Sequence, residues 1–222
     1  MKYSEYRKAF SPARLNKYLK ACGGNTMAAL TLYRRNNKLC QKLYGVLGVF
    51  EVVLRNAINE HYISKYSDQD WIRHQLKPGG ILVNHPQREL LEKTITELDR
   101  TGRYTNDRVV SSVTFGFWTH LFSRRPFSAG GKSLLEIFTR KTKGVGQRAI
   151  YRDLRAIKDF RNRIAHHEAI CFDSTGAKNT AFARENYLRI IKYVQFLGYP
   201  ERQLYYGLDV VPEKIIRKID QL

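Results

Sequence analysis

The segment RNRIAHHE, residues 161–168, combines side-chain types that can bind a phosphate and transfer a proton. Arg161 and Asn162 are followed, after three residues, by His166. A guanidinium carries a fixed positive charge, an amide donates and accepts hydrogen bonds, and an imidazole changes its protonation near neutral pH. Phosphate binding and proton transfer are what RNA cleavage without a metal ion requires. Arg161, Asn162 and His166 are therefore the candidate catalytic residues.

The apolar spacing around this segment predicts a helix from about Gln147 to Ala169, with the motif in its last turns. The predicted buried stripe consists of Leu154, Ile157, Phe160 and Ile164. Asn162 and His166 are four residues apart, so they are neighbours on a face that points away from this stripe. We therefore expect His166 to meet solvent, a substrate or another subunit rather than the core.

The choice between the two adjacent histidines stays open. Arg163 and His167 form a second pair with the same spacing as Asn162 and His166. Glu168 follows His167 directly and could orient it as a base. We favour His166 and treat Arg163, His167 and Glu168 as auxiliary candidates.

Other residues could serve either the motif or only the fold. On a helical wheel Arg161 lies about 140° from His166, so it could pair with a buried acid such as Glu51, or its long side chain could reach toward His166. Arg55 and His61 belong to a second Arg-Asn…His arrangement, one residue longer than the first. That arrangement could be a subsidiary part of the site, but a Glu51–Arg55 ion pair on an amphipathic helix is the simpler interpretation.

The charge of the chain favours a polyanionic partner. Its 222 residues hold 39 Lys and Arg against 20 Asp and Glu, a formal net charge of +19, and such a charge attracts polyanions by steering and counterion release. Between residues 124 and 163 there are twelve basic and three acidic residues, and a second basic cluster spans residues 34–42. These residues could be a solvated helix face, but we favour a phosphate-binding track, and nucleic acid over an anionic membrane surface. The candidate RNA-binding residues are Arg124, Arg125, Lys132, Arg140, Lys141, Lys143, Arg148, Arg152 and Arg155.

Several classes of site are not indicated. The three cysteines lack the pairing and spacing of a disulfide framework or a zinc site, and His74, His85 and His120 lack metal-ligand spacing. Neither a Gly-x-x-x-x-Gly-Lys phosphate loop nor a Gly-x-Ser-x-Gly elbow occurs. We expect no metal and no cofactor. An apolar leader and an apolar run of 18 residues are also lacking, so a cytoplasmic protein without a membrane segment is expected.

The predicted elements are all helices. Runs with two-residue alternation do not occur, and turn signals such as Gly23-Gly24 and Pro78-Gly79-Gly80 separate helical tracts. Within one of these tracts, Phe115, Phe117 and Trp118 could stack on bases, although core packing is the commoner use of such aromatics. The predicted helices begin at Pro12 and cover residues 26–66, 87–99, 107–122, 132–142, 147–169, 179–197 and 213–222. The chain is therefore predicted to be all-α, with residues 1–222 in one domain.

The Arg-Asn-x-x-x-His pattern in an all-α chain resembles the HEPN superfamily. Together with EVVLRNAINEHY and VVSSVTFGFWTHLFS upstream, it is similar, more narrowly, to the abortive-infection (Abi-like, AbiD/AbiF type) family. The resemblance implies a HEPN-like helical bundle with additional helices, and a homodimer whose two motifs meet at one site. It also implies cleavage of RNA without metal, by 2′-hydroxyl attack that leaves 2′,3′-cyclic phosphate ends.

The resemblance assigns a role to each motif residue and a biological setting to the chain. Arg161 would hold the phosphate, Asn162 would orient the site and His166 would handle the proton. Members of the family are implicated in phage defence as toxins, and some relatives are held inactive by a small structured RNA, which would suit a charge of +19.

Two other classes of function compete with this interpretation. A catalytically silent RNA-binding protein would use the same residues to grip phosphate. A protein-interaction module would use its charge to bind an acidic partner. Only the enzyme produces new RNA ends, and copurified nucleic acid would argue against the protein-interaction module.

Overall fold

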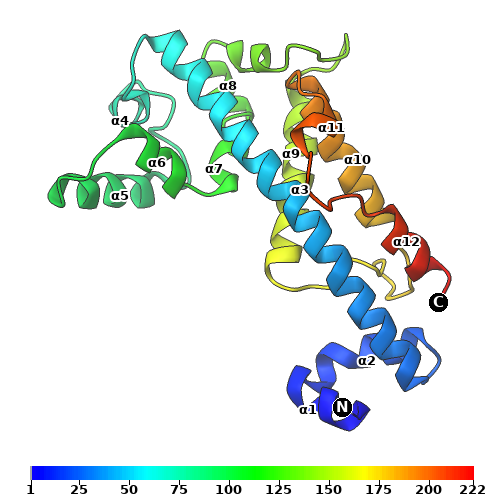
Figure 1. Cartoon of the computed structure of the whole chain (residues 1–222). Coiled ribbons are helices and arrows are strands. Elements are labelled where there is room, and N and C mark those ends of the chain that lie inside the picture. The colour runs from blue at the N-terminus through cyan, green and yellow to red at the C-terminus, as the bar shows by residue number, and fades with distance from the viewer. Residues whose placement is uncertain (1) are drawn as a thin grey trace. The chain divides into compact units, whose positions relative to one another are not determined.

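The computed structural model describes residues 2–222, and every regular element among them is helical, which confirms the all-α prediction (Figure 1). A single antiparallel bridge, Phe172 to Lys178, is the only β-type pairing in this range. The α-helices are α1 Tyr3–Phe10, α2 Pro12–Ala21, α3 Thr26–Tyr66, α4 Trp71–Gln75, α5 Arg88–Arg100, α6 Asn106–Ser112, α7 Phe115–His120, α8 Arg124–Ala129, α9 Gln147–Ala165, α10 Ala181–Phe196, α11 Glu201–Leu204 and α12 Glu213–Asp220, with a 3₁₀ helix at Ser133–Ile137.

Local signals in the sequence account for the boundaries of the first long helices. Ser11 accepts a hydrogen bond from the Arg14 amide at 3.4 Å and precedes the proline that opens α2. Gly23 and Gly24 take positive φ angles after α2. The Asn25 side chain then caps α3 by accepting hydrogen bonds from two amides of its first turn. As predicted, α3 runs without interruption to Tyr66.

Three predicted helices differ from those observed. The tract 132–142 is helical only over the 3₁₀ segment Ser133–Ile137. The tract 107–122 is split into α6 and α7 because Val113 and Thr114 are extended, and the Thr114 hydroxyl exchanges hydrogen bonds with the Gln87 side chain at 2.8 and 3.1 Å. The motif helix α9 ends at Ala165, four residues before the predicted end. The short helices α1, α4, α8 and α11 were not predicted, because segments of this length carry too few periodic positions.

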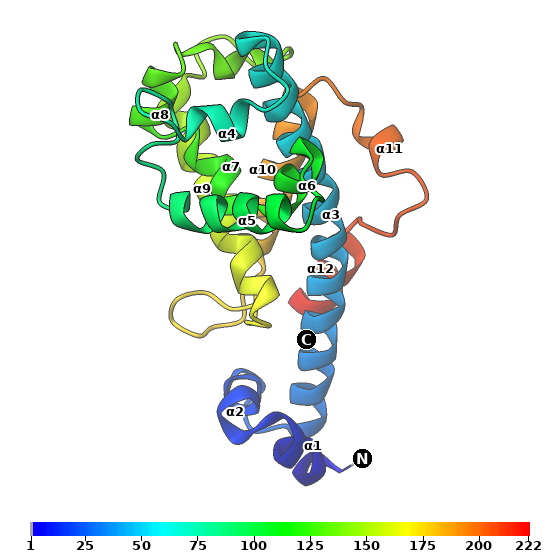
Figure 2. The ribbon, with the colours of Figure 1, turned by 90° about the vertical axis from the view of Figure 1, so that its left-hand side faces the viewer.

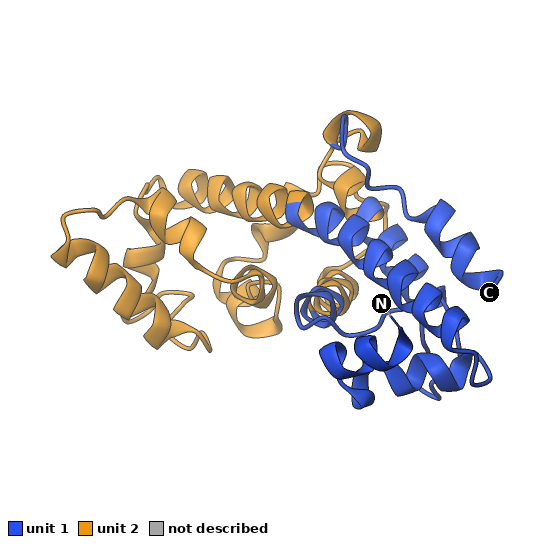
Figure 3. Ribbon diagram, turned by 60° about the horizontal axis from the view of Figure 1, so that its bottom comes forward, with its two compact units in different colours: residues 1–48, 159–191, 205–222 blue, residues 49–158, 192–204 orange. Residues whose placement is uncertain are grey.

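The chain divides into two compact units (Figure 3). Unit 1 comprises the residues up to Gly48, Asp159–Ile191 and Tyr205–Leu222, and unit 2 comprises Val49–Lys158 and Lys192–Leu204. The units are contact clusters within one chain, so the single domain over residues 1–222 stays a prediction.

Unit 1 has an aromatic core in which α1 and α2 pack on the N-terminal half of α3 (Figure 2). The Tyr33 ring lies 5.2 Å from Phe10 and 5.3 Å from Tyr18. The side chain of the buried Asn36 accepts a hydrogen bond from the Ile170 amide at 3.0 Å. This bond ties α3 to the segment that follows α9, so the end of the motif helix is attached to the core of unit 1.

Unit 2 buries the aromatic run of α7. Phe115, Phe117 and Trp118 are at most 3% exposed, so these rings form core and do not offer faces for base stacking. In the same unit the indole of Trp71 donates a 2.9 Å hydrogen bond to the buried Asn59. A buried carboxylate, Asp153, accepts hydrogen bonds from Lys192 at 2.5 Å and from the Tyr193 hydroxyl at 3.1 Å, which joins α9 to α10.

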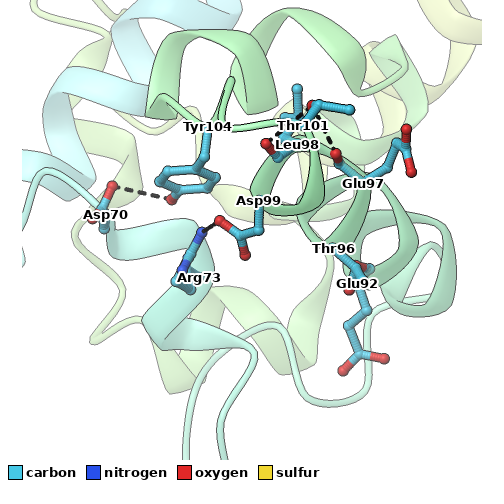
Figure 4. A network of polar contacts seen from close by, with 9 residues as sticks. All are labelled: Asp70, Arg73, Glu92, Thr96, Glu97, Leu98, Asp99, Thr101 and Tyr104. Carbon is cyan, nitrogen blue, oxygen red and sulfur yellow. Dashed lines mark hydrogen bonds and ion pairs between the residues drawn. The ribbon is translucent and has the colours of Figure 1, made fainter.

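A polar network in unit 2 connects α4 with the end of α5 and the loop after it (Figure 4). Arg73 donates a 2.7 Å hydrogen bond to Asp99, and its guanidinium lies 3.7 Å from the centroid of the Tyr104 ring. The Tyr104 hydroxyl donates to Asp70 at 3.0 Å. Every charged group in this network has a partner of opposite charge or a hydroxyl, so we interpret the cluster as a structural tie.

Candidate functional site at the end of helix α9

The sequence correctly predicts which side of α9 is buried. The side chains of the predicted stripe, residues 154, 157, 160 and 164, are at most 4% exposed. Asn162 is half-buried and His166 is exposed. The His166 amide donates to the Asn162 carbonyl at 2.9 Å, the last helix-type bond of α9. The candidate amide and the candidate imidazole are therefore one turn apart on the outward face of the helix.

The helix stops because His167 adopts a left-handed backbone conformation, with φ of 57°. Its amide donates to the Ile164 carbonyl at 3.0 Å, and the Glu168 amide donates to the Arg163 carbonyl at 2.8 Å. These two bonds make a Schellman cap, a motif in which glycine usually takes the left-handed position. A side chain at that position costs about 1 kcal/mol. The predicted continuation of the helix to Ala169 is wrong for this reason.

One arginine contacts the strained residue, and a second contacts the residues that follow it. The side chain of Arg14 donates a 2.7 Å hydrogen bond to the His167 carbonyl. Arg163 donates to the Ala169 carbonyl at 2.9 Å, lies 3.2 Å from the Glu168 carboxylate, and stacks 4.8 Å from the Phe182 ring. Because the Glu168 carboxylate pairs with Arg163, the expected orientation of His167 by Glu168 is not observed. Arg163 and Glu168 thus belong to the cap.

The remaining motif candidates are divided between the two units. Arg161 is half-buried in α9, on unit 1, which agrees with its position on the helical wheel. Glu51 and Arg55 belong to the part of α3 in unit 2. The Nε of Arg55 has no hydrogen-bond partner among residues 2–222, and the Glu51–Arg55 ion pair stays a prediction. In the second Arg-Asn…His arrangement, His61 lies 2.9 Å from the Ser133 hydroxyl.

All nine candidate RNA-binding residues lie in unit 2, whereas the candidate catalytic residues lie in unit 1. Eight of the nine are exposed and Lys141 is half-buried. Arg148, Arg152 and Arg155 follow each other at steps of four and three, so they share one face of α9. The only ion pair that the nine form within the described residues is a 3.7 Å contact between Arg152 and Asp153.

Sequence reasoning missed a cavity of about 720 Å³ in unit 1, beside the end of α9. Ile164, Ala165 and His167 line one side of it, and residues of α1, α2 and α3 line the rest. The missed lining residues that can bind a ligand are Arg14, Tyr33, Asn37, Gln41 and Tyr44. Three of them, at positions 37, 41 and 44, repeat at helical spacing, and this polar ridge, which overlaps the basic cluster at residues 34–42, was the available signal.

A second hollow of about 730 Å³ lies between α3 and α12, also in unit 1. Its basic lining residues are Lys38, Lys42, Lys214 and Lys218, and its only acidic one is Asp209, which pairs with Lys42. Two of these lysines belong to the basic cluster predicted at residues 34–42. Gln41 lines both hollows, so they meet at this residue of α3. We refer to the second hollow as the lysine groove.

The thiols of Cys40 and Cys171 in unit 1 are not activated. Burial raises the pKa of Cys40 to about 11 and that of Cys171 to about 12, so both remain protonated at neutral pH and are poor nucleophiles. All three cysteines are free. Among residues 2–222 no group of His, Cys, Asp and Glu is arranged to hold a metal ion, and no helix there combines the length and apolarity needed to cross a bilayer.

Comparison with known proteins identifies no relative: no protein-family model, no curated protein and no solved structure matches the chain.

Proposed function

We propose that this chain is a metal-independent endoribonuclease whose acid–base group is His166. The observation that carries the proposal is the exposed Asn162–His166 face at the end of α9, one residue before a cap that fixes the backbone. The net charge of +19 supports an RNA substrate. The resemblance of the motif to HEPN ribonucleases, and of the chain to the Abi-like family, supports the reaction type and a role as a toxin in phage defence.

The proposed reaction needs few groups. The ribose 2′-oxygen attacks the adjacent phosphorus, the bond from phosphorus to the 5′-oxygen breaks, and a 2′,3′-cyclic phosphate remains. His166 accepts the proton of the 2′-hydroxyl. The leaving 5′-oxygen takes a proton from water or from a second imidazolium, such as the one that the other subunit of a dimer would supply. Asn162 hydrogen-bonds the phosphate. Arg161 is the proposed phosphate cation, which is the role that the resemblance assigns to it.

The test compares wild-type protein with His166→Ala and His167→Ala, each incubated with total RNA in EDTA. We expect His166→Ala to lower cleavage by about a hundredfold or more, the usual contribution of a general acid–base group. We expect His167→Ala to retain activity. Sequencing of 2′,3′-cyclic ends measures both effects. Equal cleavage by wild type and His166→Ala would exclude His166 as the base.

A silent RNA-binding protein is the second candidate, favoured by the lysine groove and by the eight exposed candidate RNA-binding residues of unit 2. It predicts salt-sensitive binding of RNA without new ends. Removal of any copurified RNA before the assay separates this candidate from an enzyme that is held inactive by a bound small structured RNA.

A further inference from the structure

We infer that the cavity beside His167 is a pocket for one base of single-stranded RNA, so that it sets the base preference of the bound strand. The inference rests on the proposed function for its substrate class and deepens it. We refer to this cavity as the base pocket.

One wall of the base pocket offers both hydrogen bonding and stacking. Asn37, Gln41 and Tyr44 lie at steps of four and three along α3, so their side chains project on one face of the helix. All three are exposed, Tyr44 at 54%. Amide side chains donate and accept at once, which suits the mixed edges of nucleobases. An exposed tyrosine ring provides a face on which any base can stack.

The floor of the base pocket is aromatic and neutral. Phe10 and Tyr33 contact each other there, and Phe10 retains 39% exposure. The half-buried Cys40 thiol also lines the floor and stays protonated at neutral pH, because desolvation raises its pKa to about 11. A flat, apolar surface beside amide groups matches a base, which has apolar faces and a polar edge.

The opposite side connects the base pocket to the motif. Arg14 lines the base pocket and donates to the His167 carbonyl, and His167 itself lines it. A guanidinium has five N–H groups, so this bond leaves donors for a base carbonyl or a phosphate. His166 is the neighbour of His167 in the chain. A base in the pocket therefore lies beside His167, one position along the chain from the residue that we propose to handle the proton.

Charge determines which ligand suits the base pocket. None of its eleven lining residues is a carboxylate, and it meets the lysine groove at Gln41. Among the described residues, Lys38, Lys214 and Lys218 form no ion pair. A strand can place phosphates along these lysines and a base in the pocket, which requires a polyanion with aromatic side groups. Single-stranded RNA has this chemistry.

The test measures binding rather than cleavage, so that it does not depend on catalysis. Full-length His166→Ala protein is titrated with short labelled RNAs of A, C, G or U alone, and anisotropy gives four Kd values. We expect a preference of about tenfold or more for one base. Tyr44→Ala should weaken all four by about fivefold to a hundredfold. Asn37→Ala and Gln41→Ala should reduce the preference. Tyr206→Ala is the matched control, because Tyr206 is 89% exposed and does not line the pocket.

Three results would overturn the inference. The first is unchanged Kd values in Tyr44→Ala and Gln41→Ala together with weaker binding in Lys38→Ala and Lys218→Ala. The second is equal affinity for all four RNAs. The third is a dimer, measured by sedimentation, that Tyr44→Ala dissociates without changing RNA affinity, because a second copy would then cover the pocket. Cleavage by wild-type protein is assayed in parallel. Base preference without cleavage would overturn the proposed ribonuclease activity and support the base pocket. Cleavage without base preference would support the ribonuclease activity and overturn the base pocket.

Discussion

At the scale of single residues, His167 is where the backbone of the candidate site is strained. It takes a left-handed conformation without being glycine, and the Arg14 side chain and the Schellman bonds keep it there. Backbone strain of this kind persists only where the surrounding structure imposes it, and it often occurs at functional sites. The cap fixes the backbone directly after His166, the residue that follows the end of α9.

Replacement of His167 by glycine separates strain from chemistry. We expect His167→Gly to raise the free energy of unfolding by up to about 1 kcal/mol, because glycine adopts positive φ without steric cost. We also expect cleavage at the wild-type rate if His166 is the base. Urea denaturation and the cleavage assay measure the two effects. A stable variant without activity would assign the proton-transfer role to His167 instead of His166.

Arg163 is an auxiliary site candidate in the sequence and part of the helix cap in the structure. Arg163→Met keeps the length of the side chain but removes the bond to Ala169 and the ion pair to Glu168. We expect the free energy of unfolding to fall by about 1 to 3 kcal/mol, because a charge-assisted hydrogen bond is lost and the Ala169 carbonyl is left without its donor. Urea denaturation measures the loss, and unchanged stability would show that the cap does not need the arginine.

At the scale of elements, Asp153 joins α9 to α10 within unit 2. It is 8% exposed, and its carboxylate accepts hydrogen bonds from Lys192 and Tyr193. We expect Asp153→Ala to lower the free energy of unfolding by about 3 kcal/mol, since it leaves partners of a buried carboxylate without their acceptor. Arg152→Ala is the matched control and should change stability by less than about 0.5 kcal/mol, because that guanidinium is exposed. Equal effects in urea denaturation would contradict the assigned role of the carboxylate.

At the scale of the whole molecule, stability is expected to fall with acid through a buried histidine. Burial, with the nearby His120, lowers the pKa of His85 from 6.5 to about 4. The unfolded chain then binds more protons than the folded one between these two values, so stability rises with pH across this window and is lost as pH falls through it. The change is at most about 3 kcal/mol. Urea denaturation near pH 7 and near pH 5 should show a smaller difference in His85→Gln than in wild type.

Salt dependence belongs to the same scale, because it counts the phosphates that the entire surface contacts. For single-stranded RNA, the logarithm of the binding constant should fall by about 0.7 per contacted phosphate for each decade of salt. Lys218→Ala should reduce this slope by about the same amount if the lysine groove holds one phosphate at that position. Affinity that stays constant across salt concentrations would exclude an electrostatic mode of RNA binding.

The sequence by itself determined the features that depend on local pattern. The helical class, both ends of α3, the buried stripe of α9 and the exposure of His166 all follow from the spacing of apolar residues and from capping residues such as Asn25. Such features are encoded within one or two turns of chain, where side chains three and four residues apart share an environment.

Only the tertiary structure decided how the end of α9 is built and what lies beside it. Arg14 and His167 are 153 positions apart in the chain, and the base pocket takes its walls from α1, α2, α3 and α9. Contacts over such separations leave no periodic signal in the sequence. The use of Arg163 in the cap was hidden for a related reason: a histidine in place of glycine at the left-handed position is tolerated because distant side chains hold it there.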